Sequence, residues 1–194
     1  EKPKVFWAEI SKLPRFSWDK DGLFASNKGH ILIPTGAYIL GLLNSRVTWF
    51  VMSQIAVPLR LRAGLWQYQL TQQFVSRVPV PNFTATQMDN FNRISEEITL
   101  LARSRYQMHQ EVRKQISADF ASGEAIGSQI SLYEWWELSD IDALTDEIRT
   151  RYKVKFPPAK QGEWARLLDA KKAEHQRLTE QIIVLETRMN EIVY

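Results

Sequence analysis

Two apolar seams constrain the fold of this 194-residue chain more than any other feature of its sequence. In each seam, apolar residues recur at spacings of three and four, which places them along one side of a helix, as in a coiled coil. The first seam consists of Phe91, Ile94, Ile98, Leu101, Met108 and Val112, with Arg105 in its polar slot. The second consists of Trp164, Leu168, Leu178, Ile182, Leu185, Met189 and Ile192, with Lys171 and His175 as polar breaks. We expect the two helices to pack against each other as an antiparallel pair.

The ends of these helices and the elements between them carry local signals. Thr84 and Gln87 have the spacing of a capping box, which predicts that the first helix begins there, and its seam predicts an end at about Phe120. The second long helix is predicted to run from about Glu163 to the end of the chain.

The segment between the two seams is predicted to hold one short helix. Residues 121–138 are predicted to be a loop, and residues 153–162 a connector long enough for an antiparallel return. Ser139 and Asp142 predict the cap of a short helix that ends at Tyr152.

The first 34 residues are rich in aromatic, β-branched and turn-forming residues, which predicts a small antiparallel sheet. The predicted strands are Val5–Ile10, Arg15–Trp18, Leu23–Ser26 and His30–Ile33. Two polar turns are predicted to connect them, Asp19-Lys20-Asp21-Gly22 and Asn27-Lys28-Gly29, and Gly22 is free to take a positive φ.

A buried helix is predicted to follow at Thr35–Ile55, ended by Pro58. The apolar stretch around it, Tyr38–Val57, is interrupted too often by polar residues for a membrane span, which needs about 20 apolar residues. Leu59–Gln69 is predicted to be a loop that runs into a short strand. The prolines in Val78–Pro81 predict extended chain there.

These elements predict an α+β protein in two parts. Residues 1–83 are expected to form a small antiparallel sheet with a buried helix, and residues 84–194 a long antiparallel, coiled-coil-like helical spacer. Charge divides the chain at the same boundary. Residues 1–83 hold ten Lys and Arg against four Asp and Glu, a net charge of +6, while the remaining 111 residues sum to −3. Positive charge concentrated on one part of a chain is typical of a surface that binds a polyanion.

Arg60 and Arg62 lead the candidate binding residues. They lie in a Gly-containing segment beside Trp66, Gln67 and Gln69. Such side chains suit DNA, because arginine fits guanine edges and phosphates, glutamine fits adenine, and an aromatic ring can stack or wedge. The alternative is that the arginines form a solvated strand face and Trp66 belongs to the core. The candidate phosphate contacts are Lys12, Arg15, Lys20, Lys28 and Arg77, and for the first four a plain solvated surface is the alternative.

Other residue patterns point away from catalysis. The chain has no cysteine, which excludes disulfides and cysteine-based zinc, redox or nucleophile chemistry. His30, His109 and His175 have no local metal-ligand spacing. Asp169-Ala170-Lys171 matches part of a nuclease site, but it lies on a predicted coiled-coil helix without a companion acid. Trp135-Trp136 is expected to belong to the core or to an interface rather than to a base-stacking platform.

Several blocks of the sequence resemble the TaqI-like C-terminal specificity domain. Those in the first half of the chain are Pro3–Trp7, Arg15–Asp19, Phe24–Lys28, Ile39–Arg46, Leu59–Gln69 and Val78–Pro81. Those in the second half are Trp136–Leu138, Glu163-Trp164 and Met189–Tyr194. The resemblance covers most of the chain. It implies a target recognition domain with a helical spacer, from an adenine-specific DNA methyltransferase of type IIG restriction–modification or phage-defence systems in bacteria.

The resemblance also implies how function is divided. The Asn-Pro-Pro-Tyr motif and the cofactor-binding glycines of such methyltransferases do not occur in this chain. The chain is therefore expected to be the specificity half, which recognises duplex DNA and has neither enzymatic activity nor a cofactor of its own. The parent would use S-adenosylmethionine in a methyltransferase domain of the same chain. Endonuclease activity and a requirement for magnesium are further options for this parent.

A second interpretation of the same residues is a helical interaction module. Its helices would dock a partner subunit or a second copy of the chain, and the basic head would be incidental. In both interpretations the protein is expected to be cytoplasmic, with no membrane contact. DNA recognition also requires the basic turns and loops to converge on one surface.

Overall fold

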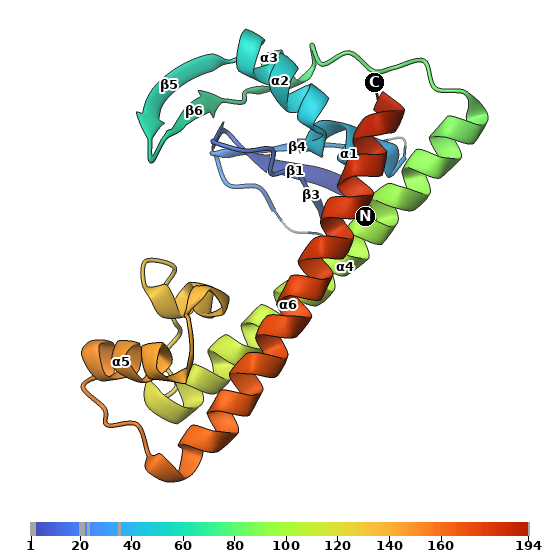
Figure 1. Ribbon diagram of the computed structural model, residues 1–194. Helices are drawn as coiled ribbons and strands as arrows, with labels where there is room; N and C mark the ends of the chain where they lie inside the picture. Colours follow the sequence, from blue (N-terminus) through green and yellow to red (C-terminus); the bar gives the residue numbers. More distant parts are fainter. Residues whose placement is uncertain (1–2, 20–21, 23, 35, 194) are drawn as a thin grey trace. The chain divides into compact units, whose positions relative to one another are not determined.

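The computed structural model describes residues 3–19, 22, 24–34 and 36–193 (Figure 1). The protein is α+β, with two small antiparallel sheets and two long helices, which confirms the predicted fold class. The chain divides into two compact units, the first comprising Glu1–Thr99 and Ile183–Tyr194 and the second Leu100–Ile182. The long helices α4 (Ala85–Phe120) and α6 (Pro158–Val193) contribute to both units. The functional boundary after residue 83 stays a prediction.

Both sheets lie in the first unit. The first sheet has the order β3-β1-β4 and consists of β1 (Lys4–Ala8), β3 (Ser17–Asp19) and β4 (Gly29–Leu32). The second has the order β2-β6-β5 and consists of β2 (Ile10–Ser11), β5 (Val57–Arg62) and β6 (Leu65–Gln69). Val5 and Trp7 alternate along β1 into the core, which also holds Phe16 and Met52. The short helix α3 (Gln72–Val75) adds Phe74 to the same core.

Two predictions for the first sheet are wrong. Residues 24–26 form no strand, and Leu23 lies outside the described residues. Phe24 is 91% exposed, and β1 is already paired on both sides, so this segment does not join it. The strand predicted at Arg15–Trp18 shifts to Ser17–Asp19, because the side chain of Asn44 hydrogen-bonds both backbone polar groups of Phe16. Gly22 has the expected positive φ, 79°.

The single helix predicted at Thr35–Ile55 is also wrong, and its predicted start, Thr35, lies outside the described residues. Two helices form instead, α1 (Tyr38–Asn44) and α2 (Arg46–Ile55). Ser45 between them is extended, and its Oγ accepts a hydrogen bond from the Thr48 N–H at 3.1 Å, which caps α2. Among the described residues, no helix combines the length and the apolar character that crossing a membrane would require.

Leu59–Gln69, predicted as a loop that runs into a short strand, lies in a strand pair. The short strand is present as β6, whereas the predicted loop is largely strand β5 and the turn. β5 and β6 form an antiparallel hairpin with Ala63 and Gly64 in its two-residue turn, at φ values of 52° and 74°. Two positive φ values in a row give the turn a twist that matches the flanking strands. The helix before Pro58 ends at Ile55, as predicted. Pro58 lies inside β5, where an edge strand with a bulge tolerates a residue without an N–H.

Within the first unit, α1 approaches the ends of both long helices. A Cβ placed on Gly41 would lie 2.8 Å from the Phe91 ring on α4 and 2.9 Å from Met189 Sδ on α6. The Arg46 N–H donates to Asn190 Oδ1 at 2.9 Å. Glycine at position 41 therefore allows a helix contact that a side chain would prevent.

The capping box at the start of α4 is confirmed. The Gln87 N–H donates to Thr84 Oγ1 at 3.2 Å, and the Thr84 N–H donates to Gln87 Oε1 at 3.0 Å. The helix ends at Phe120, as its seam predicts.

The second unit contains the expected antiparallel helix pair. Arg105 Nη1 donates to Thr179 Oγ1, and Trp164 Nε1 donates to Asp119 Oδ2, both at 2.9 Å. A 3-10 helix, η1 (Ser131–Glu137), and helix α5 (Ile141–Tyr152) pack on this pair. Their shared core includes Ile116, Leu132, Trp135, Leu144, Ile148, Trp164 and Leu168.

Two helix starts in this unit differ from the prediction. Asp140, rather than Ser139, caps α5 by accepting a hydrogen bond from the Ala143 N–H at 2.9 Å. Helix α6 begins at Pro158, ahead of the expected Glu163, because proline is well tolerated at the first position of a helix. The connector is correspondingly shorter.

Candidate nucleic-acid interface

The β5–β6 ribbon, residues 57–69, is exposed over most of its length. All of β5 and the first two residues of β6 are exposed. Figure 1 shows a curved two-stranded arm whose turn lies away from α2 and α3. Arg60 and Arg62 are its only charged side chains, and it has no Asp or Glu. A two-stranded ribbon of this kind has dimensions that fit the major groove of B-DNA.

One face of the ribbon carries both arginines. Arg60 lies opposite Gln67, and Arg62 lies opposite Leu65. Directly opposite residues in an antiparallel pair project to the same side, so these four side chains form what we call the arginine face. Arg60 Nε donates to Gln67 Oε1 at 2.7 Å. This bond orients the guanidinium and leaves its terminal NH₂ groups as further donors.

The other face is apolar. Leu61 lies opposite Trp66, and the two residues are 58% and 48% exposed. Tyr68, further along the same face, packs edge-on against Trp49 of α2 with ring centroids 5.7 Å apart. Trp66 therefore belongs neither to the core nor to the surface that holds the arginines, although it is close to them in sequence.

The base of the ribbon is tied to the first sheet through Glu9. The Leu70 N–H donates to the Glu9 carbonyl at 2.6 Å, and the Glu9 N–H donates to the Lys28 carbonyl at 3.0 Å. Gln69 Nε2 donates to Glu9 Oε1 at 2.6 Å. Gln69 thus uses an amide N–H on an acidic neighbour, which leaves its side chain less available to a base. The same bonds place the turn that carries Lys28 beside the base of the ribbon.

The other predicted phosphate contacts come from separate loops. Arg15, Lys28 and Arg77 are exposed, Lys12 is half-buried, and Lys20 lies outside the described residues. Within the described part of the chain, none of these cations and neither ribbon arginine forms an ion pair, whereas Lys4 pairs with Asp19 at 3.4 Å. Unpaired cations are available to phosphate. Convergence of all these loops on one surface stays a prediction.

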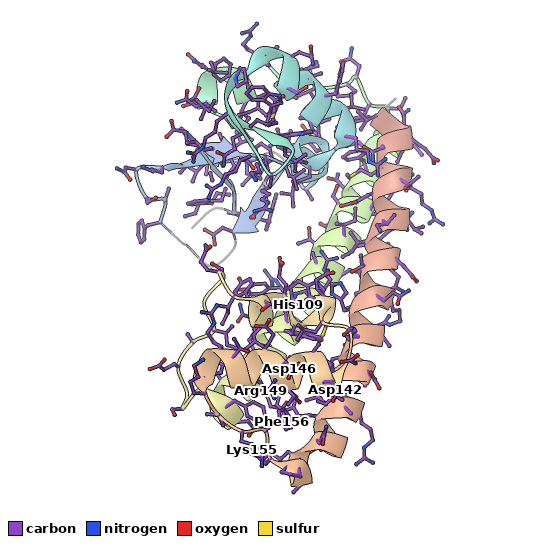
Figure 2. The ribbon with its side chains drawn as sticks, turned by 60° about the vertical axis from the view of Figure 1, so that its left-hand side comes forward. His109, Asp142, Asp146, Arg149, Lys155 and Phe156 are labelled. Carbon is purple, nitrogen blue, oxygen red and sulfur yellow. The ribbon has the colours of Figure 1, made fainter. Side chains whose placement is uncertain are left out.

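A second cluster, in the other unit, was missed by sequence reasoning. His109 Nε2 and His175 Nδ1 lie 2.8 Å apart, and the His109 ring stacks on Trp136 with centroids 3.8 Å apart. The Arg113 guanidinium lies 3.6 Å from the centre of the Tyr133 ring. We call these five residues the histidine stack; Figure 2 labels His109 on α4. Its members come from α4, η1 and α6, so the only signal in the sequence was a polar break in the second seam.

Burial and positive neighbours lower the pKa of both histidines. Burial is the main cause that lowers the pKa of His109 from 6.5 to about 4, and the adjacent imidazole and two arginines add to it. Burial and Arg105 lower the pKa of His175, against the opposing charge of Glu137.

Arg113 is 6% exposed, and its Nη1 has no hydrogen-bond partner among the described residues. In the same described part of the chain, no three His, Cys, Asp or Glu residues are grouped to hold a metal ion.

Residues 84–193 match the family described as Domain of unknown function (DUF8810). The match covers more than half of the chain, and the chain belongs to this family. The matched segment begins at the capping residue of α4 and ends at Val193, the last residue of α6, so it includes the histidine stack but not the β5–β6 ribbon. Comparison with curated proteins and with solved structures gives no match.

Proposed function

We propose that this chain recognises duplex DNA and positions it for a catalytic domain that lies outside residues 1–194. The arginine face of the β5–β6 ribbon carries the proposal. It combines two arginines and a glutamine on an exposed two-stranded arm that has no acidic residue. Arginine pairs with guanine, and glutamine with adenine, through hydrogen bonds to base edges in the major groove.

The Arg60–Gln67 pair would be the centre of base recognition. Their mutual hydrogen bond, 2.7 Å long, holds both side chains in one orientation before DNA arrives. A side chain that is already oriented loses less conformational entropy on binding. Arg62 lies closer to the turn on the same face and would reach a neighbouring base or phosphate.

Phosphate contacts would supply most of the affinity. Lys28 is the best placed of the candidates, because hydrogen bonds through Glu9 hold its turn beside the base of the ribbon. Lys12, Arg15 and Arg77 are the further candidates. Each cation that neutralises a phosphate releases counterions, so binding through these residues would weaken steeply with salt.

The resemblance to TaqI-like specificity domains supports a particular parent. In this proposal, an S-adenosylmethionine-dependent methyltransferase domain of the parent chain flips an adenine out of the duplex and modifies it. The present chain would contribute sequence recognition and bind no S-adenosylmethionine. Tight binding of that cofactor to the isolated chain, measured by calorimetry, would contradict this division.

A helical interaction module is the second candidate function. It is favoured by large apolar side chains that remain exposed on the long helices. On α4 these are Leu100 and Tyr106, 66% and 58% exposed, and on α6 they are Ile183 and Val184, both 51% exposed. Apolar side chains on exposed helix faces can bury surface against a partner subunit or a second copy of the chain.

The two candidates are distinguished by DNA binding of matched variants. Fluorescence anisotropy would measure the affinity of the whole chain for a pool of random-sequence duplexes at low salt. We expect Arg60→Ala with Arg62→Ala to weaken binding strongly. The control is Arg103→Ala with Arg151→Ala, which removes the same charge from exposed sites in the second unit. Absence of binding by the wild-type chain, or equal losses in the two double variants, would refute the proposal; a stable dimer in addition would favour the interaction module.

A further inference from the structure

We propose that the histidine stack is an acid-sensitive latch that holds η1 against α4 and α6 in the second unit. The latch joins one side chain from each of these three elements. His109 of α4 hydrogen-bonds His175 of α6 at 2.8 Å, and Trp136 of η1 stacks on both rings, with centroids 3.8 and 5.1 Å away. This inference is independent of DNA binding.

The hydrogen bond between the imidazoles requires that they not both be protonated at the contact. A neutral pair shares one N–H between Nε2 of His109 and Nδ1 of His175. One added proton can be accommodated on an outer nitrogen, with the bond intact. After a second added proton, each ring is positively charged and carries an N–H on both of its nitrogens. The two nitrogens that face each other are then both donors, so the rings repel each other.

The surroundings offer little compensation for added positive charge. The charged groups carried by the three elements around the pair are Arg105 and Arg113 on α4, Glu137 on η1, and Lys172, Glu180 and the ion pair Lys171–Glu174 on α6. Lys172 Nζ is bound to the carbonyls of Leu138 and Ser139, so it adds a cation close to η1. Glu137 and Glu180 are exposed, whereas Arg113 is buried. Protonation of the two histidines in acid therefore adds positive charge next to two arginines, Arg113, which is buried, and Arg105, which is half-buried.

Opening of the latch would release the residues that η1 buries. Trp135 is 0% exposed and packs edge-on against His109, at 5.9 Å between ring centroids. Arg113 Nε donates to the Tyr133 carbonyl at 2.8 Å. Repulsion at His109 would weaken both contacts, because the imidazole lies beside Trp135 and Arg113 alike. Release of η1 would expose an apolar surface that the closed unit hides.

The sign of the pH effect follows from the direction of both shifts. The folded pKa values of His109 and His175 are lower than the unfolded value of 6.5, so the unfolded or open form binds more protons. The latch is fully stabilising above pH 6.5. Its contribution is lost as the pH falls from 6.5 toward about 4, the folded pKa of His109.

Two measurements on the whole chain test the latch. NMR of the imidazole carbons gives the histidine pKa values, and hydrogen exchange across η1, corrected for the intrinsic pH dependence, gives its opening. We expect both stack histidines to titrate below 6.5 and η1 protection to fall with them, with up to about two protons taken up on opening. His175→Gln should lower the number of protons taken up on opening by about one, whereas His30→Gln, in the first unit, should leave this number unchanged.

The proposal is overturned if the histidines of the stack titrate at their ordinary pKa, or if η1 opens with the same pH dependence in His175→Gln and in the wild-type chain. The NMR titration uses the wild-type chain, so it decides the question even where a variant folds poorly. A rise in thermal stability on addition of Zn²⁺ that disappears in His175→Gln would also overturn it, because the two imidazoles would then be metal ligands.

Discussion

Arg60 and Trp66 project from opposite faces of the β5–β6 ribbon. Arg60 is paired with Gln67 across the strands, and Trp66 is paired with Leu61. The side chains that the sequence groups into one basic and aromatic segment therefore form two surfaces with different chemistry. One surface suits a nucleic-acid groove, and the other is an exposed apolar strip.

This separation predicts unequal effects of two substitutions on DNA binding. Arg60→Ala should cost about 1–3 kcal/mol on a duplex that contains the recognised site, the usual worth of a good bidentate base contact. Trp66→Ala should cost much less, since Trp66 faces away from the arginine face. Anisotropy titrations of both variants on the same duplex check the order. A larger loss for Trp66→Ala would show that the apolar face enters the DNA.

Two glycine substitutions should act in opposite directions on stability. Gly41→Ala should destabilise the first unit by about 1–3 kcal/mol, because its Cβ would overlap Phe91 and Met189. Gly162→Ala, in helix α6 with open space around it, should stabilise the second unit by about 0.5–1 kcal/mol. Thermal unfolding of the two variants measures both signs. A neutral Gly41→Ala would mean that α1 does not approach the long helices as closely as described.

The helical part of the fold was predictable because its signal is periodic. Apolar spacing located both long helices, and the Thr84–Gln87 pair fixed the start of α4. The break at Ser45 was not predictable in this way, since apolar spacing continues across it. What ends α1 there is a buried serine that caps the next helix.

The candidate sites were predictable only as residue types. The residue types in this segment identified Arg60, Arg62 and Gln67 as candidates. The face that each side chain occupies depends on the strand register, and a predicted loop has no register. The histidine stack was beyond sequence reasoning, because His109 and His175 meet only after α4 and α6 have packed. Strictly local signals do not identify such distant pairs.

Ser45→Ala should destabilise the first unit. The substitution removes the cap of α2 and leaves the Thr48 N–H without its side-chain acceptor in a buried site, at a cost of about 1–2 kcal/mol. Ser53→Ala is the control on the same helix, where the lost bond to the Phe50 carbonyl is exposed and the change should stay within about 0.5 kcal/mol. Urea unfolding curves compare the two. Equal midpoints would argue against a capping role for Ser45.

Asp119 should govern the acid stability of the second unit below the range in which the histidines titrate. Its hydrogen bond from Lys160, 2.7 Å long, is the main cause that lowers its pKa from 3.8, and Trp164 adds a second bond. The folded form therefore binds its proton more weakly than the unfolded form, so the stabilisation is present above pH 3.8 and is lost as the pH falls further. Asp119→Asn should lower stability at neutral pH and flatten its decline below 3.8. Urea midpoints as a function of pH measure this, and unchanged slopes would contradict the assignment.

The salt dependence of duplex affinity is the most direct test of the DNA-recognition proposal. The wild-type chain should lose affinity steeply as salt rises, with a linear plot of log K against log salt concentration. Lys28→Ala with Arg77→Ala should reduce the slope by about two, since each removes one phosphate contact, whereas Arg60→Ala should weaken affinity with a smaller change in slope. A wild-type affinity that does not change with salt, or no measurable binding at low salt, would contradict the account.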